Sequence, residues 1–119
     1  MNFDSSDLIT VAIGLFIAWQ VKSMLFGKVA PQKAKDLVAA GARLVDVGTV
    51  GEHAARHLQG SINVPLNELS ARLGELGDKA KPVVVYCASG VRSASAARSL
   101  KSAGFTQVFD LGSIGRWPG

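Results

Sequence analysis

The most restrictive feature of the sequence is an apolar run at residues 83–86 (VVVY), directly after Pro82. Consecutive β-branched residues without polar alternation are typical of a strand that is buried on both faces, as in the centre of a parallel sheet. Parallel strands need crossover connections, which are usually helices. Because helical and strand-like segments alternate through the rest of the chain, we predict a three-layer α/β sandwich with a mostly parallel sheet.

The alternation is visible in the spacing of the apolar residues. Short strand patterns occupy residues 43–47, 61–64 and 107–111 in addition to the central run. Helical patterns occupy residues 31–40, 51–58, 66–76 and 91–103. In the last of these, the spacing predicts a buried face made of Val91, Ala94, Ala97 and Leu100.

A separate apolar segment lies at residues 8–26 (LITVAIGLFIAWQVKSMLF). As a helix it would be about 28 Å long, close to the roughly 30 Å hydrocarbon core of a bilayer. Lys22, Lys28, Lys33 and Lys35 lie near its end or follow it, and the positive-inside rule then places the rest of the chain in the cytoplasm. The pattern predicts a single-pass anchor of the bacterial inner-membrane type in residues 1–27, followed by a domain in residues 28–119.

Two other interpretations of this segment stay open. A soluble amphipathic helix, or one that packs on a partner, is also compatible, because only residues 8–19 are continuously free of strongly polar side chains. A cleaved signal peptide fits less well, since Asp4 and Asp7 precede the apolar run and no basic residue does.

Nucleic-acid binding is disfavoured, because no run of basic residues interleaved with aromatic ones is present.

The candidate chemistry lies in the loop after the central strand. Cys87, the only cysteine, ends that strand, and the loop to the next helix consists of Ala88, Ser89, Gly90, Val91 and Arg92. Ligands of open parallel sheets bind at the carboxyl ends of the strands, where a helix N-terminus offers unpaired N–H groups. We expect these groups to lower the pKa of Cys87, with Gly90 permitting a tight anion-binding turn and Arg92 adding a positive charge. Although an isolated cysteine is often a buried small apolar residue, this context indicates a nucleophile.

These motifs together resemble the single-domain rhodanese family. Residues 84–93 (VVYCASGVRS) resemble its active-site stretch C-x-x-G-x-R-S, and residues 44–47 (LVDV) and 57–66 (HLQGSINVPL) resemble two earlier segments. Residues 103–105 (AGF) and 111–117 (LGSIGRW) resemble its late elements. The occurrence of these motifs in the right order, over roughly residues 31–117, makes the resemblance specific, and it implies a three-layer rhodanese-like sandwich.

The resemblance implies a sulfurtransferase. The Cys87 thiolate would take a sulfane sulfur from thiosulfate or a persulfide donor, hold it as a cysteine persulfide, and pass it to a thiophilic acceptor such as cyanide, a thiol or a partner protein. The N–H groups of residues 88–92 would hold the persulfide, and Arg92 would orient the loop and the donor. No metal or organic cofactor is implied.

The sequence departs from the family pattern in two places. Gly48 stands where relatives often carry arginine, and positions 88, 89 and 91 carry no basic residue. Thiosulfate, a dianion, is therefore expected to be a poorer donor than a persulfide. The same features are compatible with a non-catalytic, membrane-tethered interaction module of rhodanese fold.

Phosphatase or arsenate reductase chemistry is a further alternative. Such enzymes on a related fold use a C-x5-R loop, whereas Cys87 and Arg92 are separated by four residues, which leaves a pocket sized for a sulfur atom. His53 and His57 are interpreted as surface or structural residues, since sulfur transfer of this type needs no histidine base. Asp46 is interpreted as a structural hydrogen-bonding group at a strand end.

Overall fold

The computed structural model describes residues 4–119, and for residues 19–26 it describes the backbone path alone. Within this range a four-stranded sheet forms the centre of the domain, in the order β2 (Ile62–Asn63), β1 (Arg43–Asp46), β3 (Val83–Cys87), β4 (Val108–Ser113). All three strand pairings are parallel, as predicted. Every residue of β3 is buried, which explains why this strand shows no polar alternation.

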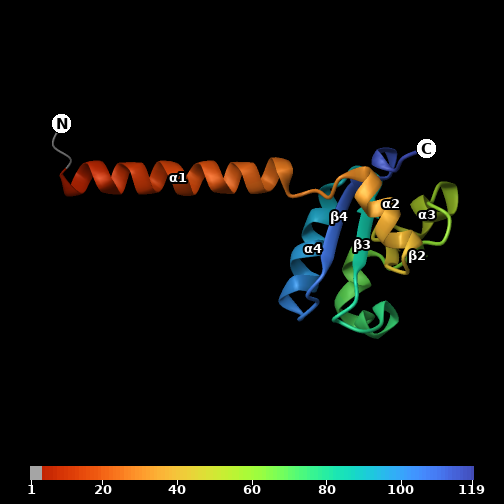
Figure 1. Ribbon diagram of the computed structural model, residues 1–119. Helices are drawn as coiled ribbons and strands as arrows, with labels where there is room; N and C mark the ends of the chain where they lie inside the picture. Colours follow the sequence, from red (N-terminus) through yellow and green to blue (C-terminus); the bar gives the residue numbers. More distant parts are fainter. Residues whose placement is uncertain (1–3) are drawn as a thin grey trace.

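Helices cover both faces of the sheet (Figure 1). On one face, α2 (Pro31–Ala39) and the short 3₁₀ helix η3 (Ile114–Arg116) pack over Val84 and Tyr86. On the other face, α4 (Val91–Ser102) and the 3₁₀ helices η1 (Leu66–Ala71) and η2 (Leu73–Leu76) pack over Val83 and Val85. Alternate residues of β3 thus enter two separate cores, because successive side chains of a strand point to opposite faces. Cys87 belongs to the α4 side.

The first helix, α1 (Ser5–Phe26), extends away from the sheet (Figure 1). It begins at a capping box, in which the Asp4 carboxylate accepts hydrogen bonds from the amides of Ser6 and Asp7 and the Asp7 carboxylate accepts one from the amide of Asp4. Among the side chains of α1 that the structure describes, seven large apolar ones are between 50% and 67% exposed, namely Leu8, Ile9, Val11, Ile13, Leu15, Phe16 and Ile17.

The predicted membrane anchor in residues 8–26, and with it the cytoplasmic placement of residues 28–119, is not supported. In the part of the chain that the structure describes, no helix has both the length and the apolar character needed to cross a bilayer. The uninterrupted apolar run of residues 8–19 would be about 18 Å long as a helix, against a hydrocarbon core of about 30 Å. Residues 1–3 of the predicted segment lie outside the described residues.

Two predicted helices differ in extent or type. The helix expected over residues 51–58 is α3 (Val50–Ala55), which ends where Arg56 adopts an extended conformation. Residues 66–76 form two 3₁₀ helices instead of one α-helix, with Arg72 between them at φ −120°. In a 3₁₀ helix, residues i and i+3 lie on the same side, so the leucine spacing still buries Leu69 and Leu76.

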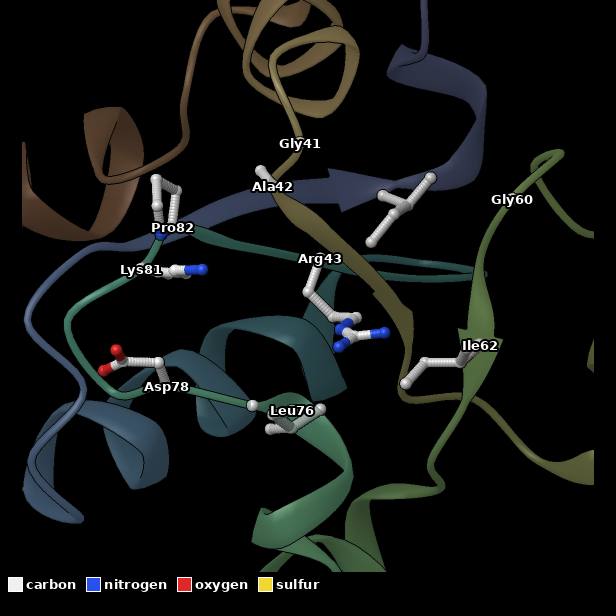
Figure 2. A pocket seen from close by; sticks show the side chains of 11 residues that line it. Gly41, Ala42, Arg43, Gly60, Ile62, Leu76, Asp78, Lys81 and Pro82 are labelled. Atoms are coloured by element: carbon white, nitrogen blue, oxygen red, sulfur yellow. The ribbon is translucent and has the colours of Figure 1, made fainter.

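A cavity of about 430 Å³ opens at the amino ends of β1 and β3, and the Arg43 side chain extends into it (Figure 2). Lys81, Asp78, Ile62 and Leu76 also line it. Arg43 pairs in register with Val83, whereas the cysteine stands at the other end of β3. This cavity is therefore separate from the loop that the sequence singles out.

Candidate active site

The structure places Cys87 at the carboxyl end of the central strand, immediately before the turn into α4. Gly90 is the N-cap of α4 with φ +93°, and its N–H donates to the Cys87 Sγ at 2.9 Å. A Cβ at this position would lie 3.2 Å from the Ser113 nitrogen and 3.4 Å from the Gly112 carbonyl carbon. Both the left-handed backbone and the close approach of β4 therefore require glycine here. The turn brings the amide to the sulfur, as the loop sequence predicted.

The surroundings of Cys87 favour the thiolate. Burial of the thiol raises its pKa, but hydrogen bonds from the amides of Ser93, Gly90 and Ser89 outweigh burial and lower the pKa below its usual value. The Ser93 hydroxyl also donates to the Gly90 carbonyl oxygen at 3.0 Å, which fixes the turn. The sulfur therefore sits in a socket of N–H groups that suits a negative charge.

Cys87 is completely buried, with 0% of its surface exposed, whereas the next two residues of the loop, Ala88 and Ser89, are exposed. A donor can therefore reach Sγ only after the atoms that cover it move.

Arg92 is held by a carboxylate that the sequence analysis did not single out. Its Nη1 and Nη2 donate to Oε1 and Oε2 of Glu52 at 2.6 and 2.8 Å, a bidentate pair. The Arg92 guanidinium and a hydrogen bond from the Thr49 amide lower the pKa of Glu52 to about 2, and the same pair raises the pKa of Arg92. The capping-box pattern T-x-x-E at residues 49–52 could have indicated Glu52 as a helix-start residue, but not its partner 40 positions away.

Asp46 and His53 form a second polar pair at the same edge of the sheet. The buried Asp46 carboxylate accepts the Gly48 amide at 2.8 Å, and its other oxygen lies 2.9 Å from Nδ1 of His53. The His53 ring stacks on His57 with 4.2 Å between centroids, and Nδ1 of His57 donates to the His53 carbonyl oxygen at 2.8 Å. Asp46 is thus a hydrogen-bonding group at a strand end, as interpreted from the sequence. Among residues 4–119, no group of three or more His, Cys, Asp and Glu side chains is placed to hold a metal ion.

Comparisons with known proteins agree with this architecture. The model of the rhodanese-like domain family matches residues 30–117. Thiosulfate sulfurtransferase PspE of Escherichia coli is 35% identical over 78 residues, which cover 65% of this chain and 75% of that protein. Uncharacterized protein YqhL of Bacillus subtilis is 30% identical over 120 residues, 97% of this chain and 94% of that protein. The solved structure of the human single-domain sulfurtransferase TSTD1 matches with a TM-score of 0.66 and 27% identity, over 76% of this chain and 93% of that one.

Proposed function

The chain belongs to the rhodanese-like domain family, and from this premise we propose that it is a sulfurtransferase that carries a sulfane sulfur on Cys87. The observation that carries the proposal is the socket of amides around Sγ, with the Gly90 N–H at 2.9 Å and a lowered pKa of the thiol. The similarity to proteins named as thiosulfate sulfurtransferases supports the same chemistry.

The proposed reaction has two displacement steps at sulfur. The Cys87 thiolate attacks the outer sulfur of thiosulfate or of a persulfide R–S–SH, so that an Sγ–S bond forms while the S–S bond of the donor breaks. Sulfite or the thiolate RS⁻ leaves with the electron pair of that bond. An acceptor nucleophile then takes the outer sulfur and Cys87 leaves as a thiolate, which its lowered pKa favours. The persulfide itself carries the sulfur, and the cycle needs no cofactor.

The loop amides and the domain as a whole each have a proposed role. After loading, the amides of Ala88, Ser89, Gly90, Val91 and Arg92 would surround the outer sulfur, as backbone nests surround anions. Residues 28–119 would act as the sulfur-carrying unit, with a small sulfane-sulfur donor or a persulfide-carrying protein as partner. Because Cys87 is buried, loading would require local movement of the residues that cover it.

Intact-mass measurement tests this function directly. Incubation of the full chain with thiosulfate and with an organic persulfide should add one sulfur, about 32 Da, which a reducing thiol then removes. The Cys87→Ser variant should gain nothing, because no other cysteine exists to carry the sulfur.

Two observations favour a second candidate function, a non-catalytic interaction module of the same fold. The Cys87 sulfur is covered and residues 88–91 carry no charge, as would suit a domain that only binds a partner. If no sulfane donor adds sulfur to the wild-type chain, this second function replaces the first.

A further inference from the structure

The positive charge of Arg92 is cancelled within the site. Both of its terminal nitrogens donate to the two carboxylate oxygens of Glu52, and the Thr49 amide donates to Glu52 as well, at 3.0 Å. Since these contacts lower the pKa of Glu52 to about 2, the carboxylate stays ionised throughout the neutral range. The ion pair therefore presents no net charge to a ligand that approaches Cys87.

A second basic side chain near the loop also has a carboxylate partner, although through a single, longer contact. Lys28 lies against Gly112, the β4 residue that packs on Gly90. Its Nζ is 3.4 Å from Oδ2 of Asp110, a buried carboxylate. Residues 88–91 carry no charge, and Asp46 adds a buried carboxylate at the same edge of the sheet. Among these groups, a bound dianion would therefore find little favourable interaction apart from hydrogen bonds with the backbone amides.

The starts of α3 and α4 add apolar side chains at this edge. Val50 begins α3 and is 67% exposed, and Val91 begins α4 and is 76% exposed. These two helices follow the carboxyl ends of the adjacent parallel strands β1 and β3, and their Glu52 and Arg92 side chains meet. An organic group could rest on such valines, whereas a sulfonate-like oxyanion would gain nothing from them.

We propose that Glu52 is a specificity-determining residue of the Cys87 site, which by neutralising Arg92 disfavours thiosulfate and leaves the site to organic persulfides. This inference rests on the proposed sulfur-carrier function. Thiosulfate brings two negative charges toward a thiolate, and an unpaired guanidinium would offset that repulsion. An organic persulfide brings at most one negative charge at its reacting end, together with an apolar group.

The test compares sulfur loading from two probes, thiosulfate and 2-hydroxyethyl persulfide, in the full chain. In Glu52→Gln the carboxylate charge is lost, while glutamine preserves the capping box with Thr49. The ratio of the thiosulfate rate to the persulfide rate should rise by about tenfold, as release of one partly exposed charge would give. This gain should shrink when salt is raised to about 0.5 M, because screening acts on a charge effect and not on a structural one.

A matched control and a second variant complete the experiment. Glu75 forms the same kind of bidentate pair with Arg72, at 2.6 and 2.8 Å, away from the loop, so Glu75→Gln should leave the ratio unchanged. Val91→Lys, at an exposed position, should raise the ratio without touching Glu52. If wild type accepts sulfur but neither Glu52→Gln nor Val91→Lys changes the ratio, the role of Glu52 is disproved while the sulfur-carrier function stands. If neither probe adds sulfur to the wild-type chain, the sulfur-carrier function fails and the inference with it.

Discussion

At the scale of single residues, Ser93 links the turn to the thiol. It is fully buried, its hydroxyl donates to the Gly90 carbonyl oxygen at 3.0 Å, and its amide is among the groups that lower the pKa of Cys87. The hydroxyl thereby holds the turn that brings the amides to the sulfur. In Ser93→Ala we expect the pKa of Cys87 to rise and sulfur loading at neutral pH to slow by about fivefold, as loss of one hydrogen bond of about 1 kcal/mol would give.

The ultraviolet absorbance of the thiolate, titrated against pH and compared with Cys87→Ser, measures this change. In wild type the thiolate should persist below the usual thiol pKa of about 8.5. Since the pKa is lower in the folded state, the thiolate stabilises the fold at high pH, and this contribution is lost as pH falls through the folded pKa. Ser99→Ala, on the exposed side of α4, is the control, and an equal titration midpoint in both variants would contradict the role of Ser93.

The same scale shows which parts of the site were predictable from sequence. The contact between Gly90 and Cys87 was predictable, because it joins residues three apart in a strand–turn–helix pattern. The Glu52–Arg92 and Asp46–His53 pairs were not, since each depends on where α3 comes to lie after β1. A sequence pattern shows that a carboxylate begins a helix, but the fold decides which cation it meets.

At the scale of secondary-structure elements, the strands were predicted better than the faces of the helices. The apolar run at residues 83–86 identified β3, because burial on both faces of the sheet favours an apolar residue at every position of the strand. For α4, apolar spacing predicted a face that includes Val91, yet Val91 is 76% exposed and Ser93, Ala96, Ala97 and Leu100 are buried. The sequence pattern treated Ser93 as a polar, exposed residue and therefore missed its place on the buried face of α4. Ser93 can be buried because its hydroxyl donates a hydrogen bond to the Gly90 carbonyl oxygen within the turn.

The junction between β3 and α4 depends on Gly90 more than on any side chain in the loop. Its φ of +93° and its contact at 3.2 Å with the Ser113 nitrogen leave no unstrained place for a Cβ. Gly90→Ala should cost about 1–3 kcal/mol of stability and shift the amide away from Sγ, so that sulfur loading falls by at least about tenfold.

Thermal unfolding and the sulfur-loading rate together measure this effect. Gly74→Ala is the matched control, because a Cβ there meets nothing within 4 Å and its φ is not positive. Unchanged loading in Gly90→Ala would show that the amide contact with Cys87 does not matter for the reaction.

At the scale of the whole molecule, the domain forms its hydrophobic cores without the described side chains of α1. Both hydrophobic cores are built from residues 29–117, and the described large apolar residues of α1 stay exposed. The chain joins the domain at Lys28 and Val29, where Lys28 pairs with the Asp110 carboxylate and the Val29 amide donates to the Asp110 carbonyl oxygen at 2.8 Å. The boundary of the stable unit should therefore fall between Gly27 and Lys28.

Two truncated chains test this boundary by their melting temperatures. A chain that begins at Lys28 keeps both contacts with Asp110, so it should melt within about 2 °C of the full chain. A chain that begins at Pro31 leaves the buried Asp110 carboxylate without its cation and also loses the packing of Val29. This loss should cost about 2 kcal/mol and lower the melting temperature by about 10 °C. An equal decrease in both chains would mean that α1 itself supports the domain, because the contacts with Asp110 would then not distinguish the two.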